Sequence, residues 1–223
     1  ILSMLLALTL CVGAQAAENT MLKVGLKYGT NALFTARLQN YNDTLSGSGY
    51  EFGYYDADRS FVPLAATDEQ RITVTVDSNA YVSGGVCYET RPTNYSTILR
   101  AYHIELLTAF GSYEEALAVA QSYPKGFVAY IDGAYRVRVG NHASYDESAR
   151  VLSETDVLAY GAQIITPSST GVVVSVTDTD TVLFEFDCSG LRSLGVRPRS
   201  VSGEKTVTWF SGYRYYGGFE YQR

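Results

Sequence analysis

Two arginines that alternate with apolar residues supply the clearest binding chemistry in this sequence. Arg136 and Arg138 lie among tyrosine and valine residues, so in a strand both would project from one face. His103 and Glu105 alternate with apolar residues in the same way. Guanidinium groups bind carboxylates through paired hydrogen bonds, and tyrosine rings offer flat apolar area with a hydroxyl. The residues that we expect to bind a ligand are His103, Glu105, Thr108, Tyr130, Arg136 and Arg138, and none is assigned a catalytic role.

A second interpretation of these residues needs no ligand. A polar sheet face exposed to water would carry similar side chains, and an exposed ion pair between Glu105 and an arginine would contribute little to stability. Glu105 would also repel the carboxylate of a ligand unless an arginine neutralised it. Both interpretations require the face that bears these residues to be open.

The elements that would position these residues lie between positions 101 and 166. Ser112 and Ser144 are each followed three residues later by Glu, which is the capping box of a helix start. Asp132-Gly133 is typical of a hairpin turn. The resulting order, βαββαβ, predicts an α+β fold: a ribonucleoprotein-like sandwich of one antiparallel sheet with two helices on one face.

The segments on both sides of this unit indicate strands. Residues 71–76 alternate between polar and apolar side chains, and residues 21–28 also favour a strand. We expect three parts, a β-rich segment at 21–97, the βαββαβ unit at 101–166 and a second β-rich segment at 171–223. The two β-rich segments are expected to pair into one small all-β domain that flanks the unit or receives it as an insertion.

The composition excludes several classes of protein. Of the 223 residues, 46% are hydrophobic and 18% are charged, which supplies enough apolar material for a folded core. The net charge of −6 argues against a nucleic acid as partner. Two histidines and the lack of C-x-x-C spacing leave no zinc site, and no metal or cofactor is expected.

The amino-terminal residues resemble an export signal. An apolar run at 2–13 precedes Ala14-Gln15-Ala16, so we predict a cleaved signal peptide over 1–16. The run is too short to cross a bilayer, which needs about 20 residues. An uncleaved anchor and a lipid-modified Cys11 remain alternatives. The expected location is therefore extracytoplasmic, with no stable membrane span after cleavage.

The unit at 101–166 resembles a SPOR domain, the sporulation-related repeat. The matching segments are YHIELLTAF at 102–110, SYEEA at 112–116, YRVRVG at 135–140 and SYDESA at 144–149. The resemblance covers less than a third of the chain. It implies a bacterial envelope or secreted protein that binds peptidoglycan, and in particular glycan strands whose stem peptides have been removed. Such strands carry free lactyl carboxylates, which the two arginines would recognise.

The flanking segments carry a second, shorter resemblance. Residues 21–28 and 213–221 resemble the region that precedes the catalytic domain in stage II sporulation protein D and amidase enhancers. That family implies a lytic transglycosylase with a Val-Pro-x-Glu motif, which this sequence lacks. We therefore expect a binding module without enzymatic activity. The alternatives are an accessory part of a transglycosylase or amidase enhancer whose active site lies beyond residue 223, with a cell-wall amidase as a possible partner, and a purely structural envelope protein.

Two cysteines remain after removal of the signal. Cys87 precedes the unit and Cys188 follows it. Export would allow a disulfide, and insertion of the unit into one β-domain would bring the two residues close together. Two separate buried thiols are the other possibility.

Overall fold

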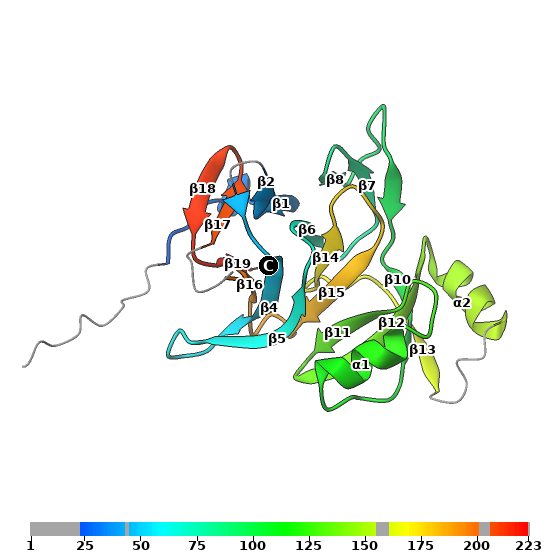
Figure 1. Ribbon diagram of the computed structural model, residues 1–223. Coiled ribbons are helices and arrows are strands. Elements are labelled where there is room, and N and C mark those ends of the chain that lie inside the picture. Colours follow the sequence, from blue (N-terminus) through cyan, green and yellow to red (C-terminus); the bar gives the residue numbers. More distant parts are fainter. Residues whose placement is uncertain (1–22, 43–44, 155–160, 201–205, 223) are drawn as a thin grey trace, which may run out of the picture.

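The computed structural model describes residues 23–42, 45–154, 161–200 and 206–222, so the expected signal peptide lies outside the described residues. Figure 1 shows an extended arrangement of strands with two helices gathered at one end, next to β10 to β13. The first half of the chain forms a 3-10 turn, η1 (Gly29–Asn31), and the strands β1 (Thr35–Gln39), β2 (Tyr41–Asn42), β3 (Leu45–Ser46), β4 (Tyr50–Tyr55), β5 (Phe61–Thr67), β6 (Arg71–Val76), β7 (Ala80–Ser83), β8 (Val86–Tyr88) and β9 (Thr97–Leu99). The second half forms β10 (Tyr102–Leu106), α1 (Tyr113–Ala120), β11 (Phe127–Ile131), β12 (Ala134–His142), α2 (Tyr145–Glu154), β13 (Ala162–Ile165), β14 (Val172–Val176), β15 (Val182–Asp187), β16 (Leu194–Pro198), β17 (Val207–Phe210), β18 (Tyr213–Tyr216) and β19 (Phe219–Tyr221).

One large sheet organises the molecule. Its ten strands run in the order β13-β10-β12-β11-β15-β14-β6-β1-β17-β18, and only the β11–β15 pair is parallel. A four-stranded sheet, β19-β16-β4-β5, a three-stranded sheet, β8-β7-β9, and the β2–β3 pair complete the described strands. Both larger sheets combine strands from before and after the helical unit, because β14 pairs with β6, β17 pairs with β1 and β16 pairs with β4.

The two helix starts and the hairpin turn that the sequence predicted are present in the structure. The Ser112 hydroxyl accepts a hydrogen bond from the Glu115 amide at 3.2 Å, and the Glu115 carboxylate accepts one from the Gly111 amide. Ser144 and Glu147 form the equivalent contacts at the start of α2. The hairpin between β11 and β12 turns through Asp132 and Gly133, both of which have positive φ, as a primed turn requires.

The expected α+β fold is wrong. Strands predominate, with 47% of the described residues in strands and 11% in helices. The order βαββαβ does occur from β10 to β13, but its strands are one end of the ten-stranded sheet and do not form a separate small sheet. The reason is the outer edge of β11, whose backbone groups pair with β15 in register from Val128 opposite Phe184 to Ile131 opposite Asp187. Local patterning contains no information about such a non-local pair.

A strand expected at 21–28 is also absent from its described part, 23–28. These residues are exposed, and Val24 retains 63% of its surface. No described strand pairs with them, so their backbone groups form no interstrand hydrogen bonds there.

Two apolar cores lie on opposite sides of the large sheet. The larger core joins that sheet to α1 and to the four-stranded sheet, with Phe184 stacked on Phe52 at 5.6 Å and in edge contact with Tyr113. The smaller core lies under the three-stranded sheet and consists of Ala80, Val82, Cys87, Leu99 and Val173.

The two cysteines belong to different cores. Cys87 is buried in the smaller core and Cys188 in the larger one, and both are free thiols. The alternative of a disulfide between them is therefore wrong, and the reading as two separate buried thiols holds. Burial raises the pKa of both thiols.

Candidate functional site

The face expected to bind a ligand is buried. Arg138 and Glu105 each expose only 5% of their surface, and His103 exposes 1%. Groups from outside the unit contribute to this environment: Glu185 of β15 accepts a hydrogen bond from Arg138, and the charges of both act on the buried Asp77 after β6. The expectation of an open face is wrong, and so is the alternative of a water-exposed ion pair.

Arg138 instead joins two carboxylates inside the sheet. Its Nε donates to Glu105 at 2.9 Å, and its Nη1 donates to Glu185, which belongs to β15 and is fully buried. The other oxygen of Glu105 accepts a hydrogen bond from Gln163 at 3.1 Å. Burial alone would lower the pKa of Arg138, but the attraction of Glu185 and Glu105 outweighs burial and raises it. Arg138 therefore remains a cation, and its burial keeps a ligand carboxylate in solution from reaching it.

The remaining predicted residues are scattered. His103 packs edge-on against Phe127, its Nδ1 lies 2.7 Å from the Gly140 carbonyl oxygen, and burial lowers its pKa. Tyr130 is 8% exposed and stacks on Phe186. Thr108 is exposed, and the half-buried Arg136 donates to the Leu107 carbonyl at 3.0 Å. Of the six residues, only Thr108 and Arg136 can reach a ligand in solution.

The same face of the large sheet carries accessible binding chemistry at the opposite end of the sheet, in β6, β1, β17 and β18. Four side chains share this face because their residues stand opposite one another in neighbouring strands. They are Arg71 of β6, Gln39 of β1, Trp209 of β17 and Arg214 of β18. We call these four residues the outer row. Since neighbouring strands lie about 4.8 Å apart, the row spans roughly 14 Å.

The burial pattern shows that the outer row faces solvent. In β1, Ala36 and Leu38 are buried, whereas Arg37 between them is exposed. In β17, Phe210 is buried while Trp209 retains 38% of its surface. Tyr216 stands opposite Val207 on the same face, and 70% of its surface is exposed. The row therefore presents two arginines, an amide and an aromatic ring on one accessible strip.

The charge of this strip is opposite to that of the chain. The four strands contain three arginines and no aspartate or glutamate, although the whole chain has a net charge of −6. The Arg37 guanidinium donates to the Gly84 carbonyl at 3.4 Å, which places this cation beside the turn of the three-stranded sheet. An acidic ligand with flat apolar faces matches this combination of guanidinium groups and rings.

Sequence reasoning did not find the outer row, because its members lie in four strands from both ends of the chain. The alternation of 71–76 was recognised, but Trp209 and Arg214 were not assigned a role. The available signal was compositional: these strands combine arginine and aromatic residues without any carboxylate. Their register, however, depends on pairing between distant segments.

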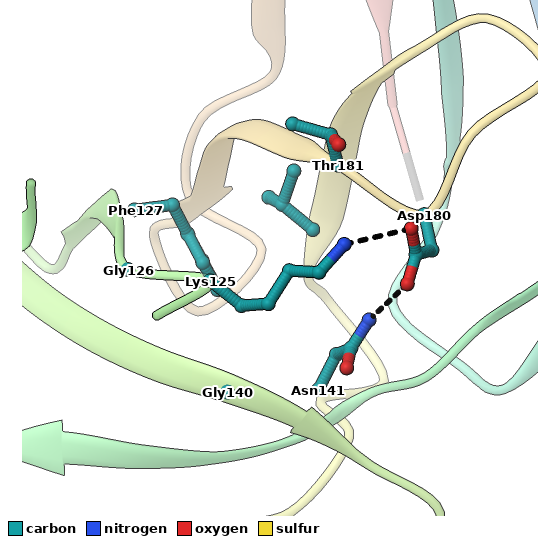
Figure 2. A pocket seen from close by; sticks show the side chains of 8 residues that line it. Lys125, Gly126, Phe127, Gly140, Asn141, Asp180 and Thr181 are labelled. Atoms are coloured by element: carbon teal, nitrogen blue, oxygen red, sulfur yellow. Dashed lines mark hydrogen bonds and ion pairs between the residues drawn. The ribbon is translucent and has the colours of Figure 1, made fainter. Parts of the chain in front are cut away.

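A second polar cluster lies where β12 meets the turn between β14 and β15. Figure 2 shows Lys125 and Asn141 pointing toward Asp180 from two sides, with distances of 2.8 and 2.9 Å to its two oxygens. Burial would raise the pKa of Asp180, but these two hydrogen bonds, together with the charge of Lys125 and a backbone hydrogen bond, outweigh it and lower the pKa. The cavity between Lys125, Asn141 and Asp180 measures about 40 Å³ and holds no more than a water-sized group.

Two further properties concern only the described residues. No group of three histidine, cysteine or carboxylate side chains among them is arranged to hold a metal ion. Within the same ranges, neither helix has the length and apolar character needed to cross a bilayer.

Comparisons of the chain with protein-family models, with curated proteins and with solved structures found no match.

Proposed function

We propose that this chain is a non-catalytic module of an exported protein that binds peptidoglycan, with a preference for glycan strands freed of stem peptides. The observation that carries the proposal is the outer row, with arginines at both ends and Trp209 between them. The SPOR resemblance of 101–149 supports the same ligand class. The binding surface, however, is the outer row and not the buried face of β10 and β12.

The chemistry of such a ligand suits the outer row. A peptide-stripped glycan has free carboxylates along its length and apolar faces on its sugar rings. Arg71 and Arg214 would hold carboxylates, while Trp209 would pack against a sugar face. Gln39 lies between Arg71 and Trp209 and would serve the ring hydroxyls as donor or acceptor.

Co-sedimentation with purified sacculi tests this function. We expect more of the chain to sediment with amidase-treated sacculi than with intact sacculi. Trp209→Ala and Arg71→Ala should each weaken binding by about tenfold, since contact residues of this kind are worth about 1–2 kcal/mol. Tyr145→Ala and Arg150→Ala are the matched controls, because both residues are exposed on α2 at the far end of the sheet.

The possible results test the ligand, the binding surface and the preference for stripped strands separately. Failure to sediment with either preparation would refute peptidoglycan binding. Binding that persists unchanged in both outer-row variants would refute the outer row as its surface. Equal sedimentation with treated and intact sacculi would refute the preference for stripped strands.

A further inference from the structure

A hollow beside the three-stranded sheet combines apolar and polar groups that the outer row does not use. The outward face of this sheet carries a cross-strand row in which Tyr81 stands between Tyr88 and Ile98. Tyr88 is 42% exposed, and the residues on the opposite face of the same strands form the smaller core. Tyr95 packs edge-on against Tyr81 at 5.2 Å and extends the aromatic surface.

Ile98 also borders the hollow, which measures about 340 Å³. The other residues around it are Thr97, Arg100, Asn141 and Asp180. This volume is at the lower end of the range for small-molecule sites, about 300–1,000 Å³. It therefore suits one ring-sized unit of a ligand, with the tyrosine row beside it for a neighbouring unit.

The polar groups at the hollow are held in place by their own contacts. Lys125 and Asn141 donate to one oxygen each of Asp180, which orients the carboxylate at the edge of the hollow (Figure 2). Arg100 lies 3.5 Å from Glu147 and is only half buried, which leaves most of its donors available. The hollow therefore offers fixed acceptors on one side and donors on the other.

The charges around the hollow balance. Arg100 is paired with Glu147, and Lys125 is paired with Asp180. A carboxylate ligand would gain little from this set, because Asp180 would repel it. A neutral ligand with many hydroxyls and one apolar face fits both the hydrogen-bonding groups and the Tyr81–Ile98 surface.

We infer that this hollow is a second binding site, which takes one unit of a neutral sugar chain. The inference stands on the hollow alone and does not depend on the proposed binding at the outer row. The two sites have no residue in common, so each can be tested without the other.

Titration of the isotope-labelled chain with a chitin trisaccharide tests the second site. This neutral oligomer of N-acetylglucosamine should shift the backbone amide signals of Ile98, Arg100 and Asn141 and leave the indole signal of Trp209 unchanged. Arg100→Ala should weaken the interaction at least fivefold, and Arg150→Ala, the matched control on α2, should not change it. A trisaccharide of galacturonic acid, the acidic probe, should bind more weakly at these amides.

Each contrary result overturns the inference. Absence of shifts with the neutral trisaccharide, or an unchanged affinity in Arg100→Ala, would exclude a sugar site in the hollow. Stronger shifts with the acidic trisaccharide would exclude a neutral ligand. Shifts confined to Trp209 would assign the sugar to the outer row alone, which would leave the proposed function standing.

Discussion

Burial gives Arg136 and Arg138 different roles, although both alternate with apolar residues in the same strand. The alternation of Arg136 and Arg138 suggested two equivalent cations on an open face, but the structure gives them different roles. Arg138 is enclosed between Glu105 and Glu185, whereas Arg136 is half exposed and contacts a backbone carbonyl. A buried ion pair stabilises only while all of its members are present.

Arg138→Ala should therefore destabilise the protein strongly, although the sequence placed Arg138 on an open sheet face. We expect a loss of about 3–5 kcal/mol in the free energy of unfolding, because two buried carboxylates would lose their partner. Urea denaturation measures this loss. Arg136→Ala is the control and should change stability by no more than about 1 kcal/mol. Similar small effects for both variants would contradict the enclosed ion cluster.

Asp77 should make stability depend on pH. Burial, followed by the charge of Glu185, raises its pKa to about 8, and Asp187 acts in the same direction while Arg138 opposes them. The folded state therefore keeps a proton that the unfolded state releases near its ordinary pKa of 3.8. The resulting stability is fully present below pH 3.8 and is lost as the pH rises through about 8.

Asp77→Asn should remove this dependence, because the amide stays neutral at every pH. Free energies of unfolding measured between pH 4 and 9 should decline less steeply for the variant than for the parent protein. His103 contributes in the opposite direction at low pH, since burial lowers its pKa, and this contribution is common to both proteins. Parallel profiles for the two proteins would show that Asp77 is ionised throughout.

Secondary-structure elements were predictable where their signals are local. Each helix start is fixed by a serine and a glutamate within four residues, and the β11–β12 hairpin by two adjacent turn residues. The outer row and the β11–β15 pair were not predictable, because both depend on which distant strands become neighbours. The prediction that the face of β10 is open was wrong for the same reason, since Glu185, which lies near this face, comes from outside the unit.

Removal of either capping hydroxyl should cost about 1 kcal/mol. Ser112→Ala would leave the Glu115 amide without its acceptor, and Ser144→Ala would do the same for Glu147. Thermal unfolding followed by circular dichroism measures both losses. Ser122→Ala is a suitable control, because Ser122 lies just after α1, its hydroxyl donates to the Ala118 carbonyl inside the helix, and it caps no helix start. Losses no larger than that of the control would contradict the capping role.

At the scale of the whole molecule, the two cores separate Cys87 from Cys188 and bury both thiols away from reagents in solution. Thiol reagents attack the thiolate, and both Cys87 and Cys188 are buried with raised pKa values. In a Cys11→Ser background we therefore expect negligible labelling of the folded protein and complete labelling of both thiols in denaturant. Rapid labelling of one thiol before unfolding would show that its core opens locally.

The position of β1 has a consequence for the order in which the chain can fold. One edge of β1 pairs with β6, which is synthesised soon after it, but the other edge pairs with β17 near the carboxyl terminus. Until residues 207–210 emerge, the backbone groups along that second edge have no partner in the described fold. An unpaired strand edge is a template for contacts between molecules. A chain that ends before β17 would therefore self-associate through β1, because the β17–β18 hairpin covers this edge in the fold.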